Sequence, residues 1–472
     1  MGGVDRDAVL GAMNGPLADL PDPLPIPPIV RGVARAQSVV SIRPPGSKSL
    51  TNRLILLAAL AKGVSVVRHA LVEADDAERM LDAVACLGAR VDRTDATAVR
   101  ITGVDGRWKV PAEGVEIFLN NAGTATRFLA ASALLSTGPI TIDGNERMRA
   151  RPMGELIAAL RTLGAEVQEL GATGCPPIRI VPPKDGVPSV NMIEFGRTQS
   201  SQFISGLLMT ASCLPHGLTF NLGPEPTSAS YVRMTVQMLE ELGVDVRLSE
   251  QMRIIRVLPG LKAFDEEVEP DASGATYWWA AGALIPGGCV RVVGLSPSSS
   301  QGDAAFVDQL ANMGAVIRRS DEQPPWVEVR GVQSLGPTLA DMSNMPDATM
   351  SLAVCCAFAG GTSILRGVRT LRVKECDRID ALQRELGRLG VTIACDVNSD
   401  SDVMTLTPPI EPIASWTDTG AEPIEFETYD DHRMAMSLAL VGLRRPNVSI
   451  RNPQCVAKTY PTFWREFAKL YD

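Results

Sequence analysis

The sequence predicts an α/β protein built from six similar repeats, because two phrases recur along the chain at a regular spacing. The first phrase is a helix-like stretch that ends in Leu-Gly or Met-Gly and leads into a short strand. Its copies recur about every 75 residues, at Leu87-Gly88, Leu163-Gly164, Leu242-Gly243, Met313-Gly314 and Leu389-Gly390. A sixth helix, Pro461 to Leu470, follows one period later. Glycine suits the left-handed position that ends a helix, which explains why it recurs there.

The second phrase is a helix rich in alanine and leucine that precedes the first phrase in each copy. The predicted helices are Ser47–Gly63, Asn121–Gly138, Ser201–Gly217, Ala272–Gly288, Pro346–Gly361 and Asp430–Arg445. The strands that follow them are Val64–Val67, Pro139–Ile142, Leu218–Asn221, Cys289–Val293, Thr362–Leu365 and Asn447–Ile450. Because helices alternate with short β-rich runs in every copy, the fold class is α/β.

Length and composition narrow the class of protein. The 472 residues are roughly three times the usual size of one domain, so we expect two or three domains. The net charge of −9 argues against a general nucleic-acid binder, and the longest apolar stretches are far shorter than the roughly 20 residues of a transmembrane helix. Nine cysteines without a Cys-x-x-Cys pair, together with three histidines, predict reduced thiols in a cytoplasmic protein and no metal site.

The first 35 residues differ from the rest in their proline content. The prolines are Pro16, Pro21, Pro23, Pro25, Pro27 and Pro28. Because closely spaced prolines disfavour helices and sheet ladders, we expect an extended, semi-rigid N-terminal extension that is dispensable. It has neither the apolar core of a secretory signal nor the Arg- and Ser-rich composition of a transit peptide.

Basic residues gather at or near the starts of the predicted helices, where a positive charge opposes the helix dipole. They are Lys48, Arg53, Arg127, Arg151, Lys374, Arg378, Arg433 and Lys458. Because helix N-termini receive anions, so many cations there predict a small, multiply charged ligand that carries phosphates or carboxylates. Gly123, within Asn-Ala-Gly-Thr, would let such a ligand approach the backbone. Neither a Walker motif nor a Gly-x-Gly-x-x-Gly motif indicates a nucleotide.

Two carboxylates, Asp347 and Glu375, lie among these cations in the fifth repeat. Asp347 could cap a helix and Glu375 could be a first-turn helix acid, which would give both a structural role. Alternatively, both carboxylates transfer protons at a catalytic site. The local sequence leaves these two interpretations open.

The motifs resemble those of the 5-enolpyruvylshikimate-3-phosphate synthase (EPSP synthase) family, over about residues 37–470 and in the family's order. The matching segments are Pro45–Arg53, Asn121–Arg127, Arg151–Gly154, Ser200–Gln202, Pro346–Ala348, Arg372–Arg378, Asp431–Met436 and Ala457–Thr459. The resemblance implies the enolpyruvyl-transferase fold, in which two domains of three βαβαββ units each enclose the active site in a cleft between them. It places the N-terminal extension at 1–35, one domain at 48–268, and the other domain at 36–47 and 269–472.

The resemblance also implies two substrates and a role for each motif residue. Shikimate 3-phosphate would be held by Lys48, Ser49, Arg53, Ser200, Ser201, Gln202, Ser228, Tyr231, Asp347, Thr370 and Lys374. Phosphoenolpyruvate would be held by Lys48, Gly123, Arg151, Gln202, Arg378, Arg433 and Lys458. Asp347 would accept the proton of the attacking 5-hydroxyl, and either Glu375 or Lys48 would protonate the methylene carbon of phosphoenolpyruvate.

By the same resemblance, the chain is a transferase of the shikimate pathway, which leads to chorismate and the aromatic amino acids, and a target of glyphosate. It would need no metal or organic cofactor. We expect a cytoplasmic monomer that binds these two small molecules and neither nucleic acid nor membrane. Two positions depart from the family: Thr370 stands where many relatives carry Asn, and Phe128 stands where many bacterial relatives carry Pro.

Two other functions fit parts of the pattern. UDP-N-acetylglucosamine enolpyruvyl transferase shares the implied fold, but that family carries Lys-Asn near the first helix and a reactive cysteine before an Arg-Pro. This chain has Lys48-Ser49 and no cysteine from Asp143 to Arg151. A non-catalytic anion-binding repeat protein would use the cations only to tether a ligand, and Asp347 would then be expendable.

Overall fold

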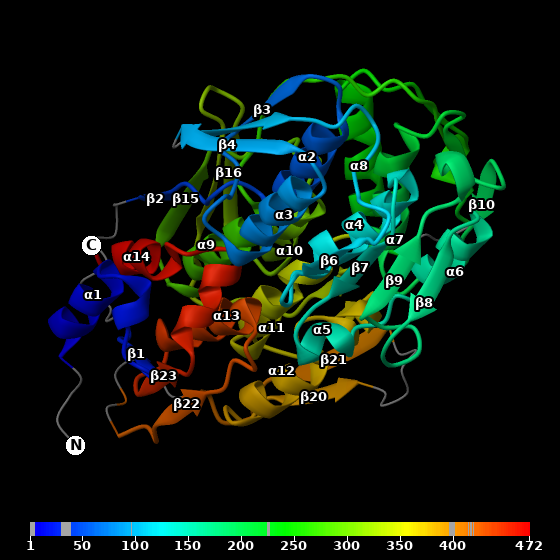
Figure 1. Ribbon diagram of the computed structural model, residues 1–472. Helices are drawn as coiled ribbons and strands as arrows, with labels where there is room; N and C mark the ends of the chain where they lie inside the picture. The colour runs from blue at the N-terminus through cyan, green and yellow to red at the C-terminus, as the bar shows by residue number, and fades with distance from the viewer. Residues whose placement is uncertain are drawn as a thin grey trace. The chain divides into compact units, whose positions relative to one another are not determined.

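The computed structural model describes residues 5–29, 39–95, 97–223, 227–395, 402–413, 415, 418 and 420–472. The chain divides into two compact units: unit 1 comprises Met1–Pro45 and Pro270–Asp472, and unit 2 comprises Gly46–Glu269. Each unit has a hydrophobic core of its own. The strands in the described part of the chain form six small sheets, and the two helices of each predicted repeat are present. The predicted α/β class with six repeats is therefore confirmed (Figure 1).

Unit 2 contains three repeats, each with a four-stranded sheet; the first and third have two α-helices, and the second has three because the short α5 precedes α6. The first has α2 (Lys48–Leu60), β3 (Val64–Arg68), α3 (Asp75–Cys86), β4 (Arg90–Asp95), β5 (Ala98–Thr102) and β14 (Asp265–Glu267). The second has β6 (Val115–Phe118), α4 (Gly123–Ser132), β7 (Ile140–Asp143), α5 (Glu146–Arg149), α6 (Gly154–Thr162), β8 (Glu166–Glu169) and β9 (Ile178–Val181). The third has β10 (Met192–Glu194), α7 (Ser201–Ala211), β11 (Leu218–Asn221), α8 (Ala229–Glu241), β12 (Val246–Leu248) and β13 (Ile254–Val257).

Unit 1 contains the other three repeats, in which η marks a 3-10 helix. The fourth has β2 (Val40–Ile42), α9 (Ala272–Leu284), β15 (Cys289–Val293), η5 (Gly302–Ala305), α10 (Phe306–Asn312), β16 (Val316–Ser320) and β17 (Trp326–Arg330). The fifth has β18 (Leu339–Asp341), η6 (Pro346–Ala348), α11 (Thr349–Ala357), β19 (Ser363–Arg366), η7 (Arg369–Val373), α12 (Arg378–Gly387), β20 (Thr392–Cys395) and β21 (Val403–Thr407). The sixth has β22 (Ile424–Phe426), α13 (His432–Gly442), β23 (Val448–Ile450), η8 (Pro453–Lys458) and α14 (Phe463–Ala468). None of the described helices is long and apolar enough to cross a membrane.

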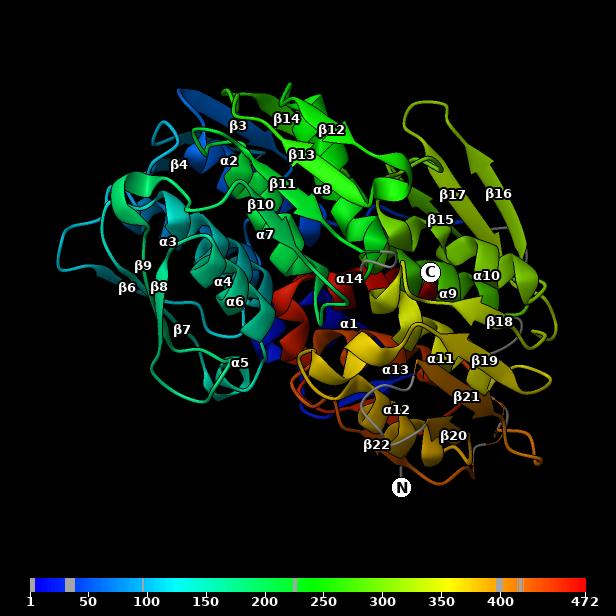
Figure 2. The same ribbon diagram turned by 90° about the vertical axis from the view of Figure 1, so that its right-hand side faces the viewer.

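The same pairing pattern runs through the sheets. The strand after the first helix lies in the middle, with a parallel strand on one side and an antiparallel strand on the other. In the third sheet β11 pairs in parallel with β10 and antiparallel with β13, and Figure 2 shows these strands side by side. Two parallel partners are distant in sequence: β14 pairs with β3, and β2 pairs with β15. The chain therefore passes into unit 2 after Pro45 and returns to unit 1 after Glu269.

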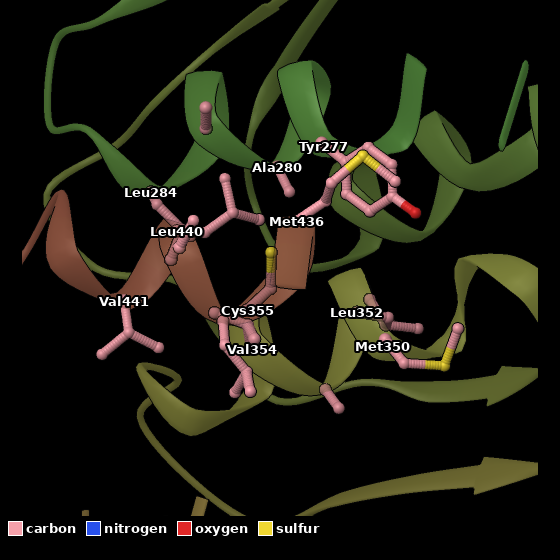
Figure 3. Packing of buried hydrophobic residues seen from close by; sticks show 14 of the residues in the cluster. Tyr277, Ala280, Leu284, Met350, Leu352, Val354, Cys355, Met436, Leu440 and Val441 are labelled. Carbon is pink, nitrogen blue, oxygen red and sulfur yellow. The ribbon is translucent and has the colours of Figure 1, made fainter. Parts of the chain in front are cut away.

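The first helix of each repeat is packed inside its unit, because it is apolar on nearly all sides. In unit 1, α9, α11 and α13 pack against one another. Figure 3 shows Tyr277, Ala280 and Leu284 of α9 next to Met436 and Leu440 of α13. In unit 2, α4 packs against both α2 and α7. These helices present their N-termini from a closely packed core, which fixes the polar residues at their starts.

The prediction of an extended arm is wrong for the described residues of the N-terminal extension, while the prediction that it is dispensable stays a prediction. Residues Arg6–Asn14 form the helix α1, whose start is capped by the Asp5 side chain. The α1 helix packs against α14, and Arg6 donates a hydrogen bond to the Tyr471 carbonyl at 3.0 Å. The prediction failed because the prolines of the extension follow this helix in the sequence and do not interrupt it. Val9 and Met13 give the helix a buried face. Residues 1–4 and 30–38, which include the start of the predicted first strand, lie outside the described part of the chain.

A second element of the extension completes the sixth sheet. Strand β1 (Leu24–Ile26) pairs antiparallel with β23, at the place that the fourth strand of a repeat takes in the other sheets. Pro25 is tolerated because β1 is an edge strand. Ile26 packs directly on α13, where a Cβ added to Gly442 would collide with Cγ2 of Ile26.

Replacing Ile26 with alanine is expected to destabilise unit 1 by about 2–5 kcal/mol, because Ile26 is 2% exposed and alanine leaves a cavity between β1 and α13. The matched control is Ile410→Ala, since Ile410 belongs to the same unit and is fully exposed. Thermal unfolding of both variants measures the difference. Equal melting temperatures for the two variants would show that the extension does not stabilise the fold.

Candidate active site

Lys48 is the first residue of α2 and is almost completely buried in unit 2. Ser47 caps this helix, since its Oγ accepts a hydrogen bond from the Leu50 amide at 3.5 Å. The ammonium group of Lys48 lies 3.3 Å from Oδ2 of Asp76, which stands in the first turn of α3 and is 1% exposed. Sequence reasoning misses Asp76, because an acid at a helix start looks like an ordinary dipole partner.

Two guanidinium groups meet at Gly123, the first residue of α4. Arg127 donates to the Gly123 carbonyl at 3.0 Å, and Arg151 donates to Oδ1 of Asn121 at 3.2 Å. A Cβ added to Gly123 would lie 2.6 Å from an Nη atom of each arginine. Both arginines are buried beside a helix N-terminus, so this place concentrates positive charge from side chains and backbone.

The start of α7 is tied to the start of α4. Ser200 caps α7, because its Oγ accepts a hydrogen bond from the Gln202 amide at 3.2 Å, and Ser201 is buried next to it. The Gln202 side chain donates from Nε2 to Oγ1 of Thr124 at 3.0 Å. The structure therefore places Gln202 beside the helix that begins at Gly123.

Arg53 is buried inside unit 2 and links α2 to α7 and α8. Its nitrogens donate to Oγ1 of Thr235 (2.8 Å), Oγ of Ser205 (3.2 Å) and the carbonyls of Ser49 (2.9 Å) and Tyr231 (3.3 Å). Burial lowers the pKa of Arg53 to about 10. Its guanidinium carbon lies 5.2 Å from the ring centre of Phe128, so Phe128 provides a cation–π contact.

Ser228 and Tyr231 lie at the start of α8. Ser228 has a left-handed backbone, with φ of 49°, and its carbonyl accepts a hydrogen bond from the Tyr231 amide at 3.1 Å. The Tyr231 carbonyl receives Arg53, so this helix start is anchored to α2.

Asp347 lies at the centre of a cluster of charged side chains in unit 1. Its Oδ1 lies 3.0 Å from Nη1 of Arg378 and 3.4 Å from Nζ of Lys374, and its Oδ2 lies 2.9 Å from Nη2 of Arg433. The helix-cap interpretation of Asp347 is wrong, because the N-cap positions of η6 and α11 are Met345 and Ala348. Three cations from three later segments hold this carboxylate instead.

Arg378 joins three carboxylates. Its Nη1 binds Asp347, its Nη2 binds Oε2 of Glu375 at 2.8 Å, and its Nε binds Oδ2 of Asp431 at 2.7 Å. Burial acts to lower the pKa of Arg378, but the charges of Asp431, Glu375 and Asp347 outweigh it and raise this pKa above its ordinary value. Asp431 also caps α13, since it accepts the Arg433 amide at 2.8 Å.

Glu375 stands between two cations. Its Oε1 lies 3.4 Å from Nζ of Lys458 and its Oε2 binds Arg378. The interpretation of Glu375 as a first-turn helix acid is wrong, because α12 begins at Arg378 and is capped by Asp377. Glu375 lies before the helix and is 8% exposed, so its charge is compensated by Arg378 and Lys458 rather than by the dipole.

Arg433 connects Asp347 to the core helix α9. Its Nη1 donates to the Tyr277 hydroxyl at 3.3 Å, and its Nη2 binds Asp347. Burial raises the pKa of Tyr277, which stays a neutral hydroxyl that can accept this bond. Tyr277 could not be predicted from the sequence, because an aromatic residue in an apolar helix looks like part of the core.

Thr370 lies on η7, four residues before Lys374. Its Oγ1 is buried and makes no hydrogen bond within the described residues. A hydroxyl in this state can donate a hydrogen bond to a ligand.

The structure joins six of the predicted residues of unit 1 in one network, and it places those of unit 2 in separate groups of contacts. In unit 1 one network holds Asp347, Lys374, Glu375, Arg378, Arg433 and Lys458. In unit 2 the starts of α4 and α7 are joined at Gln202, and Arg53 binds α7 and α8. No three His, Cys, Asp or Glu side chains among the described residues are grouped as metal ligands would be.

Comparison with known proteins gives consistent results. The model of the family described as EPSP synthase (3-phosphoshikimate 1-carboxyvinyltransferase) matches residues 30–467. The 3-phosphoshikimate 1-carboxyvinyltransferase of Nitrosomonas eutropha is 40% identical over 439 residues, which cover 91% of this chain and 96% of that protein. The enzyme of that name from Laribacter hongkongensis is 41% identical over 435 residues, covering 90% and 95%. A solved structure of EPSP synthase from Acinetobacter baumannii superposes with a TM-score of 0.69 at 26% identity, covering 90% of this chain and 93% of that one.

Proposed function

The chain belongs to the EPSP synthase family, and on that premise we propose that it catalyses the 3-phosphoshikimate 1-carboxyvinyltransferase reaction with the residues described above. The reaction transfers the enolpyruvyl group of phosphoenolpyruvate to the 5-hydroxyl of shikimate 3-phosphate and releases phosphate. The chain is thereby a transferase of the shikimate pathway, which supplies chorismate and the aromatic amino acids.

Anion binding follows from the cations that the fold has collected. In unit 2, Lys48, Arg151 and the start of α4 at Gly123 would hold phosphoenolpyruvate. In unit 1, Arg378, Arg433 and Lys458 would hold the same substrate. Shikimate 3-phosphate would be held by the polar groups at the starts of α2, α7 and α8, together with Thr370 and Lys374. These groups are Ser49, Arg53, Ser200, Ser201, Gln202, Ser228 and Tyr231. The contacts of Arg53 with Thr235 and Ser205 support a second role in fixing those helix starts.

The geometry of Asp347 supports a role for this residue in proton transfer. Three cations hold its carboxylate in one orientation, which suits a base that must meet a substrate hydroxyl. In the addition step the 5-hydroxyl oxygen bonds to C2 of phosphoenolpyruvate, its proton moves to Asp347, and the methylene carbon gains a proton. In the elimination step the bond between C2 and the phosphate oxygen breaks and phosphate leaves. The carbon that gained a proton in the addition step loses one again, which restores the enol ether.

Two residues stay candidates for protonating the methylene carbon. Glu375 is bound by Arg378 and Lys458, and Lys48 is bound by Asp76. Both are buried. After Glu375 gives up its proton, Arg378 and Lys458 stabilise the carboxylate that results, whereas Asp76 stabilises the charged form of Lys48 before it gives up a proton. We propose no metal or organic cofactor for these steps.

We propose that units 2 and 1 correspond to the two domains expected at 48–268 and at 36–47 with 269–472, and that both contribute to binding one pair of substrates. The monomeric state and the cytoplasmic location stay predictions.

The test of the function is phosphate release from phosphoenolpyruvate with alternative acceptors. Release is expected with shikimate 3-phosphate and not with UDP-N-acetylglucosamine. Release with the nucleotide sugar alone would indicate the related transferase, and binding of shikimate 3-phosphate without any release would indicate a non-catalytic binding protein.

Replacing Gly123 with alanine is expected to raise the KM for phosphoenolpyruvate by roughly ten-fold or more, because the added methyl group would displace the guanidinium groups of Arg127 and Arg151. The KM for shikimate 3-phosphate should change less. Gly196→Ala is the matched control, since a Cβ at this glycine of unit 2 meets no atom within 4 Å. Steady-state kinetics with each substrate varied in turn measures both constants. An unchanged KM for phosphoenolpyruvate in Gly123→Ala would remove Gly123 from the proposed site.

A further inference from the structure

We propose that Tyr277 is a positioning residue of the charged cluster in unit 1, because its buried hydroxyl holds the guanidinium of Arg433 in the orientation that binds the anionic groups of phosphoenolpyruvate. The inference rests on the proposed function, since it concerns the substrate that is assigned to Arg433 there. It gives a function to a neutral residue of the core helix α9, which the roles described above leave without one.

The first support is that two contacts hold the guanidinium of Arg433 from different sides. Its Nη1 donates a hydrogen bond to the Tyr277 hydroxyl at 3.3 Å, and its Nη2 binds Oδ2 of Asp347 at 2.9 Å. Because a guanidinium is a rigid plane, partners at both outer nitrogens fix the direction of the whole group, whereas a single partner lets it pivot. The Tyr277 contact therefore helps to fix where the N–H groups of Arg433 point.

The second support is that Tyr277 itself cannot move easily. It is fully buried on α9, and its ring stands edge-on to the ring of Phe463 on α14, with ring centres 5.8 Å apart. Met436, one turn after Arg433 on α13, lies next to Tyr277 in the core, as Figure 3 shows. A tyrosine that is packed by two other helices presents its hydroxyl at a fixed place.

The third support is that the hydroxyl is neutral. Burial raises the pKa of Tyr277, so the hydroxyl accepts the hydrogen bond without compensating the positive charge of Arg433. A carboxylate at this place would add a negative charge beside the arginine and weaken its attraction for an anion. Asp347 therefore binds Arg433 by charge, whereas Tyr277 orients the guanidinium and leaves its charge available to the ligand.

The kinetic test is Tyr277→Phe, which keeps the ring in the core and removes the hydroxyl. The KM for phosphoenolpyruvate should rise roughly ten-fold, which matches the loss of a hydrogen bond to a charged group. The kcat and the KM for shikimate 3-phosphate should each change by less than about two-fold, because the lost contact serves the binding of phosphoenolpyruvate in the ground state and the transition state alike. Steady-state kinetics with each substrate varied in turn measures the three constants.

The matched control is Tyr471→Phe, which also removes one hydroxyl from the buried part of unit 1. The Tyr471 hydroxyl donates to the Pro27 carbonyl at 2.6 Å, so its partner is the backbone rather than a residue of the charged cluster. This variant should have the wild-type KM for phosphoenolpyruvate. An equal rise of that KM in both variants would overturn the inference, because it would be a general effect of a weakened core. An unchanged KM in Tyr277→Phe would overturn it as well.

A second measurement needs no turnover, so it separates this inference from the proposed function. Isothermal titration calorimetry with inorganic phosphate compares the wild type, Tyr277→Phe, Arg433→Gln and the double variant. Tyr277→Phe should weaken phosphate binding roughly ten-fold when Arg433 is present. In the Arg433→Gln background the same change should weaken it by less than about two-fold, because the hydroxyl acts through the guanidinium.

The outcomes of the titration decide between the two claims. Equal weakening in both backgrounds would show that Tyr277 does not act through Arg433 and would overturn the inference. Weakening that depends on Arg433, in a protein that releases no phosphate from phosphoenolpyruvate with shikimate 3-phosphate, would contradict the proposed function and support the positioning role. Turnover with both substrates and an unchanged phosphate affinity in Tyr277→Phe would contradict the positioning role alone.

Discussion

Replacing Asp347 with alanine is expected to reduce kcat by roughly 10³-fold, within the 10²- to 10⁴-fold contribution of general acid–base catalysis, while binding of shikimate 3-phosphate is largely retained. The physical reason is that no other carboxylate replaces it at the point where Arg378, Arg433 and Lys374 meet. Phosphate release gives kcat, and isothermal titration calorimetry gives the affinity for shikimate 3-phosphate.

Two further variants make this result specific to the proton acceptor. Asp347→Asn keeps the shape and the hydrogen-bonding capacity of the side chain but cannot accept the proton, so it should be nearly as slow as the alanine variant. Asp321→Asn removes an exposed carboxylate of the same unit and should leave kcat unchanged. Turnover like that of the wild type in either Asp347 variant would refute the assignment of Asp347 and would favour a protein that only tethers anions.

Replacing Arg378 with methionine is expected to destabilise the protein strongly. This substitution removes the guanidinium that binds Asp347, Glu375 and Asp431 and leaves three carboxylates uncompensated in a buried place. Removing one partner of a buried ion pair costs about 3–5 kcal/mol, and for a unit of this size that corresponds to a melting temperature lower by about 10 °C.

The control for this prediction is Arg384→Met on the same helix. Arg384 is 64% exposed and pairs with Asp380, which is 46% exposed, so its loss should cost no more than about 1 kcal/mol. The difference between the two variants should shrink in acid. Acid protonates the carboxylates, after which Arg378 has no negative charge to compensate and its removal costs less. A deficit of Arg378→Met that is the same at pH 4 and pH 7 would show that packing, not charge, accounts for it.

The repeats could be found in the sequence because each depends on local signals. A glycine follows the second helix in five of the six repeats, and an apolar first helix recurs in all six. The structure has α2, α4, α7, α9, α11 and α13 where these signals place them. The N-terminal extension shows the limit of local signals. Its prolines predicted an arm, but the partners of Leu24 and Ile26 lie in β23, more than 400 residues later in the chain.

The candidate site, like the fold, has features that the sequence predicts and features that it does not predict. Cations at helix starts oppose the dipole, and this conflict can be read from the sequence alone, so Lys48 and Arg433 were predicted, and they stand in the first turns of α2 and α13. Arg151 lies shortly before α6. The prediction that Lys458 opens a helix is wrong, because Lys458 ends η8 and α14 begins only at Phe463. Which carboxylate binds each cation could not be predicted from the sequence. Asp76 for Lys48 and Asp431 for Arg378 look like ordinary first-turn and capping acids, and only the contact made by folding distinguishes them.

The sequence by itself determined the α/β repeats, the positive charge at their helix starts and the family, because periodicity, dipoles and motifs are properties of neighbouring residues. The tertiary structure decided which charges compensate each other and how Asp347 is held by three cations. The reason is that burial and charge–charge distance depend on segments that meet only after folding.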